Sequence, residues 1–105
     1  MKKILILLFI TFNVQLLSLD FLVIDVRTPD EYSLGYVESS KNIEWQEISS
    51  IKETINKEQK IYLYCRSGNR SQRATDILIE FGYKDVTNLG SMSEAANFLK
   101  LKIIN

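Results

Sequence analysis

Residues 60–82 read KIYLYCRSGNRSQRATDILIEFG, an apolar run followed by a polar loop and an amphipathic segment. The apolar run, residues 60–65, predicts a buried strand because it is rich in β-branched and aromatic side chains. Residues 70–81 predict a helix, and Gly82 is typical of the position just after a helix ends. One face of that helix is expected to be buried, and it consists of Ala74, Ile77, Leu78 and Phe81.

The same alternation extends in both directions along the chain. Residues 21–26 (FLVIDV) and 86–89 (VTNL) predict two further strands, and residues 42–44 predict a weak one. Helices are predicted after Thr28, over residues 46–57 and over residues 93–101, the last with Ala96, Phe98 and Leu99 inside. The fold expected from strands that alternate with helices is one small α/β domain, with a mostly parallel sheet flanked by helices.

The first of these helices has a well-defined start. Thr28 is a suitable N-cap, Pro29 suits the first helical position, and Glu31 completes a capping box. Gly35 is the predicted stop. In folds of this class, ligands bind beyond the carboxyl ends of the strands, which is where this helix and the polar loop both begin.

The composition excludes several kinds of catalytic site. The chain has 105 residues with 13 Lys+Arg, 13 Asp+Glu, one Cys and no His. The absence of His excludes Ser-His-Asp and Cys-His arrangements and His-containing metal sites. A single Cys excludes an internal disulfide, a CxxC redox pair and a Cys-based zinc site. The balanced charges give no overall field that attracts nucleic acid, so we expect no nucleic-acid partner. From the residues available, we also expect no metal and no cofactor.

The first 19 residues have the features of an export signal. Lys2 and Lys3 precede a nine-residue stretch, residues 4–12, that is apolar except for Thr11. A membrane-spanning helix needs about 20 apolar residues, so the run is too short to span. We predict a signal peptide over residues 1–19, a domain over residues 20–105, and an exported protein, periplasmic or extracellular, without stable membrane insertion after signal removal. The alternative is that residues 4–12 form a buried strand or helix.

The polar loop carries the candidate chemistry. Cys65 ends the predicted strand, and the loop continues through Arg66, Ser67, Gly68, Asn69, Arg70 and Ser71. Backbone N–H groups at such a strand-to-helix turn converge on an anion, and the arginines add positive charge with no acidic residue between positions 65 and 75. A Cys in this setting titrates at roughly 3.5–7.5 in place of about 8.5. The prediction is a reactive thiolate, and the alternative is a buried structural cysteine.

Several motifs, in order along the chain, resemble those of the single-domain rhodaneses, which are thiosulfate sulfurtransferases, and in particular their small exported type. The resemblance covers roughly residues 21–98. Its pieces are Asp25-Val26-Arg27, Glu31-Tyr32 with Gly35, Asn42-Ile43, the Cys-x-x-Gly-x-Arg-Ser loop from Cys65 to Ser71, and Gly82-Tyr83, Val86, Asn88-Leu89 and Gly90. The sequence departs from the family where Tyr36 stands in place of a usual His, Ser39-Ser40 in place of Gly-Ala, and Ser91 in place of a second Gly. No departure falls within the loop.

The resemblance implies both a mechanism and residue roles. Cys65 would take the outer sulfur of thiosulfate as a persulfide and pass it to a thiophilic acceptor, cyanide or a thiol. Arg70 would act with it in catalysis. The donor would be bound by the residues of the loop, namely Arg66, Ser67, Gly68, Asn69, Arg70 and Ser71. Asp25, Arg27 and Glu31 are interpreted as a structural acid–base cluster that joins the first strand to the following helix, and the domain is expected to be a monomer or a weak dimer.

Two other functions remain open from the sequence. The first is that the domain is a persulfide carrier or a non-catalytic binding module. The second, which is less favoured, is that it is a phosphatase or an arsenate reductase. Cysteine phosphatases use Cys-x5-Arg, whereas Cys65 and Arg70 form Cys-x4-Arg, so the shorter loop favours a terminal sulfur over a tetrahedral phosphate.

Overall fold

The computed structural model describes residues 20–105 of the chain. The predicted signal peptide, residues 1–19, lies outside the described residues, and so does its alternative as a strand or helix. Within residues 20–105, no helix is both long enough and apolar enough to cross a membrane.

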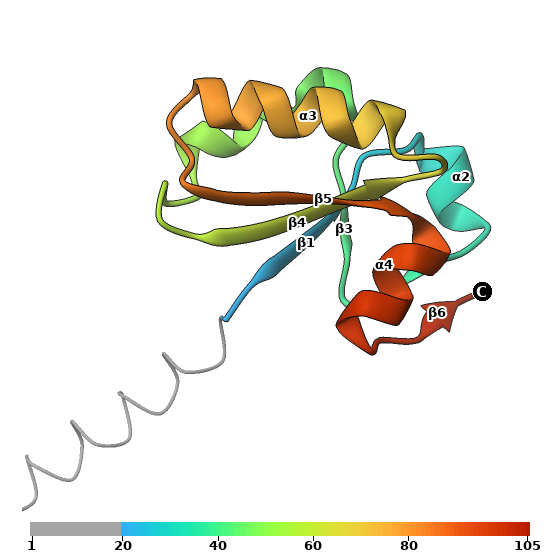
Figure 1. Cartoon of the computed structure of the whole chain (residues 1–105). Coiled ribbons are helices and arrows are strands. Elements are labelled where there is room, and N and C mark those ends of the chain that lie inside the picture. The colour runs from blue at the N-terminus through green and yellow to red at the C-terminus, as the bar shows by residue number, and fades with distance from the viewer. Residues whose placement is uncertain (1–19) are drawn as a thin grey trace, which may run out of the picture.

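Four parallel strands form the central sheet, in the order β3-β1-β4-β5 (Figure 1). Their bounds are Leu22–Asp25 for β1, Lys41–Asn42 for β3, Lys60–Cys65 for β4 and Asp85–Ser91 for β5. The two central strands are continuous apolar runs, as expected for strands covered on both faces. Their carboxyl ends all reach one edge of the sheet, and β4 delivers Cys65 to that edge.

Helices cover both faces of the sheet (Figure 1). On one face lie α3 (Asn69–Glu80) and the 3-10 helix η1 (Trp45–Glu53), which pack on a core around Ile24, Ile61 and Leu63. On the other face α4 (Met92–Leu99) packs on a smaller core around Val23 and Tyr64. The short helix α2 (Pro29–Ser33) lies beside the carboxyl edge. The predicted fold class, a small α/β domain with a mostly parallel sheet, is confirmed.

The capping box predicted for α2 is present. The Thr28 hydroxyl accepts from the Glu31 N–H, and the Glu31 carboxylate accepts from the Thr28 N–H at 3.0 Å. This exchange satisfies two backbone donors that the start of a helix leaves free. It also holds the Glu31 side chain at the carboxyl edge of the sheet.

Two segments differ from the prediction in secondary structure. Residues 45–53 form a 3-10 helix in place of the predicted α-helix over 46–57. Ile48 and Ile51 are both buried there, and a spacing of three residues matches the 3-10 repeat. The second difference is a short antiparallel pair, β2 (Tyr36–Val37) with β6 (Ile103–Ile104), which the sequence did not predict. Two-residue strands are too short to produce a periodic pattern.

Two side chains predicted to be buried are exposed. Phe81 follows the last residue of α3 and is 38% exposed, and Phe98 on α4 is 61% exposed. The centre of the Phe98 ring lies 5.7 Å from that of the Tyr62 ring on β4. The prediction that these two side chains are buried was therefore wrong, because helical spacing alone does not show how far the opposing surface extends.

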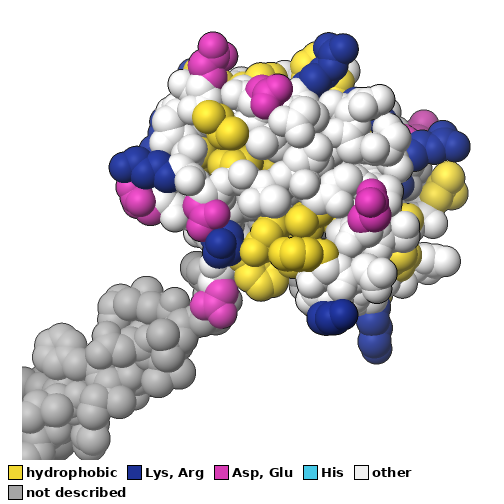
Figure 2. All heavy atoms as spheres, in the orientation of Figure 1, with side chains coloured by type: hydrophobic (Ala, Val, Ile, Leu, Met, Phe, Trp, Pro, Cys, Tyr) yellow, Lys and Arg dark blue, Asp and Glu magenta, His cyan; other side chains and the backbone are white. Residues whose placement is uncertain are grey.

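Lysine, arginine and acidic side chains are interspersed over the face of the molecule shown in Figure 2. This face carries no broad field of one sign, which agrees with the equal numbers of basic and acidic residues in the chain. The electrostatic features that matter are therefore local ones, and they lie at the carboxyl edge of the sheet.

Candidate active site

The loop that follows β4 wraps around the Cys65 side chain. Gly68 adopts φ +99 at the N-cap of α3, a left-handed conformation that favours glycine. A Cβ at this position would also lie 3.3 Å from the Cα of Gly90. Glycine is thus required twice over at position 68, once for the turn and once for the close approach of β5.

The Cys65 sulfur sits among hydrogen-bond donors. The Gly68 N–H donates to Sγ at 3.0 Å, and the Ser71 hydroxyl lies 3.3 Å from it. Burial raises the pKa of the Cys65 thiol, but hydrogen bonds from the Ser71 hydroxyl and from the N–H groups of Ser71, Gly68 and Ser67 outweigh it. The pKa therefore lies below its ordinary value. The loop stabilises negative charge on this sulfur.

Cys65 is also fully buried, with 0% of its surface exposed. Burial by itself fits the alternative reading, a structural cysteine in the core. An inert core thiol, however, would be surrounded by apolar groups, and its pKa would rise. The donors around Sγ are those expected for a site that holds an anion. A reagent would have to reach the sulfur past the loop, whose residues Arg66, Ser67 and Asn69 are exposed.

Asn88 on β5 organises the loop, and the sequence did not predict this role. Its Nδ2 donates to the Gly68 carbonyl at 3.1 Å, and its Oδ1 lies 2.7 Å from the Ser71 hydroxyl. Oδ1 also accepts from the Gly90 N–H at 3.0 Å. The only signal in the sequence was the place of Asn88 in the closing motif of the family that the chain resembles.

Arg70 is paired with Glu31 of α2. Its two terminal nitrogens lie 2.8 and 3.1 Å from the two carboxylate oxygens, a bidentate geometry. The sequence grouped Glu31 with Asp25 and Arg27 as a structural cluster, and the hydrogen bonds of the Glu31 carboxylate go to Arg70 and Thr28. Glu31 holds the first turn of α3 against α2. The role of Arg70 in catalysis and in binding a sulfur donor stays a prediction.

Asp25 and Arg27 form a separate buried pair at the end of β1. The Arg27 guanidinium contacts the carboxylate of Asp25 through Nε and Nη2, the latter at 2.7 Å. Nη2 also donates to the Gly35 carbonyl at 2.6 Å. The pair therefore joins the end of the first strand to the segment just after α2. Hydrogen bonding to Asp25, although opposed by burial, raises the pKa of Arg27.

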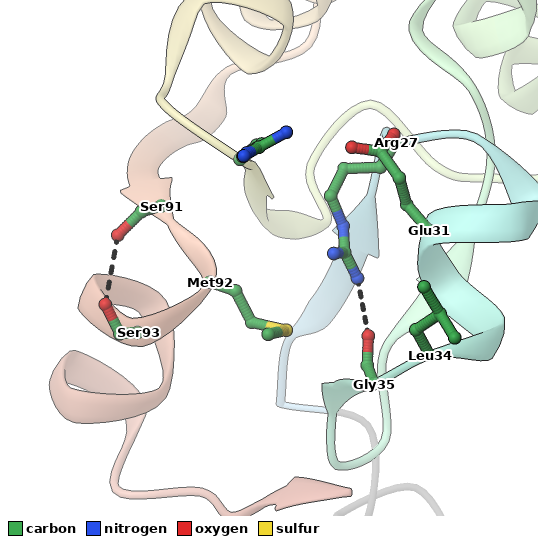
Figure 3. Close-up of a pocket in the computed structure, with 8 residues that line it drawn as sticks. Arg27, Glu31, Leu34, Gly35, Ser91, Met92 and Ser93 are labelled. Carbon is green, nitrogen blue, oxygen red and sulfur yellow. Dashed lines mark hydrogen bonds between the residues drawn. The ribbon is translucent and has the colours of Figure 1, made fainter. Parts of the chain in front are cut away.

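A pocket of about 390 Å³ opens beside the loop at this edge (Figure 3). Leu34 at the end of α2 and Met92 at the start of α4 face it from opposite sides. Arg27 and Arg66 bring positive charge to its lining. Among the described residues, no group of three or more His, Cys, Asp or Glu side chains could hold a metal ion. The pocket lining combines these two arginines with the Glu31 carboxylate, and it lies on the outer side of the loop that covers Cys65.

The Glu31–Arg70 pair makes a testable contribution to stability. Hydrogen bonding to Arg70, opposed by burial and helped by Thr28, lowers the pKa of Glu31 to about 2. Because an unfolded Glu titrates near 4.3, the contribution is fully present above that pH and is lost as the pH falls toward 2. We expect Glu31→Gln to cost about 1–2 kcal/mol at pH 7, after allowance for solvent screening.

Urea unfolding of both proteins at pH 7 and at about pH 3 measures this contribution. The difference between wild type and Glu31→Gln should shrink at the lower pH. Glu58→Gln serves as the control, because the Glu58–Lys84 pair is largely exposed and is expected to contribute little. An equal cost for Glu31→Gln at both pH values would contradict the expectation.

Comparisons with known proteins point to one family. The model of the rhodanese-like domain matches residues 13–97, a match that begins within the predicted signal segment. The putative mitochondrial thiosulfate sulfurtransferase of Schizosaccharomyces pombe is 35% identical over 94 residues, which cover 76% of this chain and 66% of that protein. The thiosulfate sulfurtransferase PspE of Escherichia coli is 35% identical over 75 residues, 70% of this chain and 72% of that protein.

Solved structures agree with the sequence comparisons. A structure described as rhodanese with anions from E. coli superposes with a TM-score of 0.70 at 29% identity, covering 80% of this chain and 96% of that chain. The rhodanese-like domain of an Anabaena protein superposes with a TM-score of 0.71 over 81% of this chain and 99% of that chain. At 19% identity, this second similarity supports the fold alone.

Proposed function

The chain belongs to the rhodanese-like domain family, and from that membership we propose that it is a thiosulfate sulfurtransferase working through a Cys65 persulfide. Two relatives that are 35% identical are named as thiosulfate sulfurtransferases. The observation that best supports the proposal is the set of hydrogen-bond donors around Cys65: the Gly68 N–H and the Ser71 hydroxyl lie 3.0 and 3.3 Å from Sγ. These donors suit a sulfur atom that must bear negative charge.

The first half of the reaction moves one sulfur atom onto the enzyme. The Cys65 thiolate attacks the outer sulfur of thiosulfate and forms a new S–S bond. The bond between that sulfur and the sulfonate sulfur breaks, and its electron pair leaves with sulfite. The enzyme then holds a persulfide whose terminal sulfur carries the negative charge. The loop favours the ionised form of the nucleophile, so the step does not depend on a histidine base, which suits a chain without histidine.

The second half of the reaction returns the enzyme to its starting state. A thiophilic acceptor such as cyanide attacks the terminal sulfur, takes it as thiocyanate, and leaves the electron pair of the S–S bond on Cys65. The two half-reactions share one covalent intermediate, so ping-pong kinetics are expected. A thiol acceptor would be consumed in the same way and would leave as its own persulfide.

The charges around the pocket suit a doubly negative donor. Arg66 lines the pocket and is exposed, and no ion pair involves it within residues 20–105. Arg70, in contrast, is already held by Glu31. We therefore assign the sulfonate end of thiosulfate to Arg66, and the developing charge on sulfur to the backbone N–H groups of the loop.

The test uses the protein from residue 20 onward, incubated first with thiosulfate alone. Intact mass should increase by one sulfur atom, and addition of cyanide should then remove that atom and yield thiocyanate catalytically. A sulfur adduct without turnover would indicate a persulfide carrier. The absence of both adduct and turnover would refute the proposal and favour a non-catalytic module, whereas hydrolysis of an aryl phosphate would indicate the phosphatase alternative.

A further inference from the structure

The Ser71 hydroxyl lies between two acceptors. Its oxygen is 2.7 Å from Asn88 Oδ1 and 3.3 Å from Cys65 Sγ. A serine hydroxyl carries a single proton, so Ser71 cannot donate to both at once. Ser71 is fully buried, which leaves the two acceptors in competition for the same proton.

The orientation of the Asn88 amide is fixed by its other partners. Oδ1 accepts from the Gly90 N–H at 3.0 Å, and Nδ2 donates to the Gly68 carbonyl and to Gln72 Oε1, both at 3.1 Å. A flipped amide would place an N–H group against the Gly90 N–H and an oxygen against the Gly68 carbonyl. The hydrogen-bond network therefore places the carbonyl oxygen of Asn88, which only accepts, on the side of the amide that faces Ser71.

The two protonation states of Cys65 require different positions of the Ser71 proton. As a thiol, Cys65 can donate to Ser71 Oγ while Ser71 donates to Asn88, at a distance typical of a strong O–H···O bond. As a thiolate, Cys65 only accepts. A Ser71 hydroxyl that turns toward Sγ to stabilise this charge leaves Asn88 Oδ1 with the Gly90 N–H alone.

We propose that Ser71 and Asn88 form a proton switch, in which Ser71 donates to Asn88 beside the thiol and to Sγ beside the thiolate, so that Asn88 opposes ionisation. Ser71 and Asn88 are then positioning residues for the nucleophile. Their bearing on catalysis rests on the proposed function, whereas the switch itself concerns only the ionisation of Cys65. The lowered pKa of Cys65, in which the Ser71 hydroxyl is the strongest of the lowering influences, is consistent with this arrangement.

The switch also favours the forward reaction. When Cys65 accepts a sulfur atom, the charge moves from Sγ to the terminal sulfur. Ser71 is then free to turn back to Asn88 and restore the shorter hydrogen bond. In the persulfide, Asn88 and Sγ therefore no longer compete for the Ser71 proton. The loss of this competition favours transfer of the sulfur atom from the donor to Cys65.

Ultraviolet thiolate absorbance measures the ionisation directly, and Cys65 is the only cysteine in the chain. Each titration is corrected by subtracting the same titration of a Cys65→Ser protein, which removes the signal of the five tyrosines. We expect Ser71→Ala to leave about ten-fold less thiolate at a given pH below the midpoint, and Asn88→Leu to give about three- to ten-fold more. Ser71→Thr keeps the hydroxyl and should restore the wild-type midpoint.

The decisive measurement is the double variant. In the Ser71→Ala background, Asn88→Leu should have no effect on the midpoint, because the proton for which Asn88 competes is gone. A merely structural role for Asn88 would shift the midpoint equally in both backgrounds. That result would overturn the proposal, as would an unchanged or raised midpoint for Asn88→Leu alone.

Two further variants keep the test interpretable. Gln72→Leu removes another partner of Asn88 without touching Ser71, and it should leave the midpoint unchanged. Gly68 O also accepts from the Gln72 N–H at 3.0 Å, so the loop keeps one bond there when Asn88 is replaced. If Asn88→Leu does not fold, Asn88→Ala is expected to shift the titration midpoint of Cys65 in the same direction, to lower pH. The charged groups at this edge of the sheet are the Asp25–Arg27 pair at the end of β1, the Arg70–Glu31 pair between α3 and α2, and Arg66 of the loop, and no variant alters them.

These outcomes are separate from those of the proposed function. The titration needs no thiosulfate, so a protein that forms no persulfide can still show the switch. A protein that turns over thiosulfate can equally fail the double-variant test. Failure of one proposal is therefore distinguishable from failure of the other.

Discussion

Cys65→Ser is expected to abolish both the sulfur adduct and thiocyanate formation, with a fall in turnover of at least about a thousand-fold. Losses of up to about 10⁶ in kcat accompany the removal of a covalent nucleophile in other enzymes. Serine keeps the shape of the side chain, and its hydroxyl can accept from the same Gly68 and Ser71 donors that face Sγ. It is not ionised near neutral pH, however, so no nucleophile remains to attack the outer sulfur.

The same variant separates chemistry from folding. Cys65 belongs to the larger core, and serine replaces only one buried atom there, so Cys65→Ser should unfold cooperatively within a few degrees of wild type. Circular dichroism and thermal unfolding check this point before any assay. A folded Cys65→Ser protein that still makes thiocyanate from thiosulfate and cyanide would contradict the persulfide mechanism.

The core of the site could be predicted from sequence because its signals are local. Cys65, Gly68 and Ser71 lie within seven consecutive positions, at the end of an apolar strand and the start of an amphipathic helix. Strand and helix periodicity fix where such a loop stands in an α/β fold, and the helix N-terminus supplies the N–H groups. The predicted edge of the sheet and the donors around the thiol therefore needed no information from distant parts of the chain.

The partners of the loop could not be predicted because they come from distant segments. Glu31 is 39 positions from Arg70, and Asn88 is 17 from Ser71. A sequence gives charge and hydrogen-bonding capacity, but it does not show which of several acids reaches a given arginine. For that reason Glu31 was grouped with its neighbours in sequence, Asp25 and Arg27, whereas its ion pair is with Arg70 at the start of α3.

The second large effect is expected for Asp25→Asn, which should destabilise the domain by about 3–5 kcal/mol. Asp25 is fully buried and Arg27 is 7% exposed, so neither charge is well solvated. Asparagine has the size of aspartate but no charge, and it would leave the Arg27 guanidinium uncompensated in the interior. Because the total stability of a native protein is only about 5–15 kcal/mol, this loss is a substantial fraction of it.

The matched control is Asp85→Asn. Asp85 also forms an ion pair, with Lys60 at 3.0 Å, but the side chains of both partners are 44% exposed. Exposed pairs contribute only about 0–1 kcal/mol. Urea unfolding at pH 7 should therefore separate the two variants clearly. Replacing both members of the buried pair, in Asp25→Asn with Arg27→Leu, should cost less than Asp25→Asn alone, since no unpaired charge is then buried. Asp25→Asn costing no more than Asp85→Asn would show that the buried pair does not hold the end of β1 to α2 as the geometry indicates.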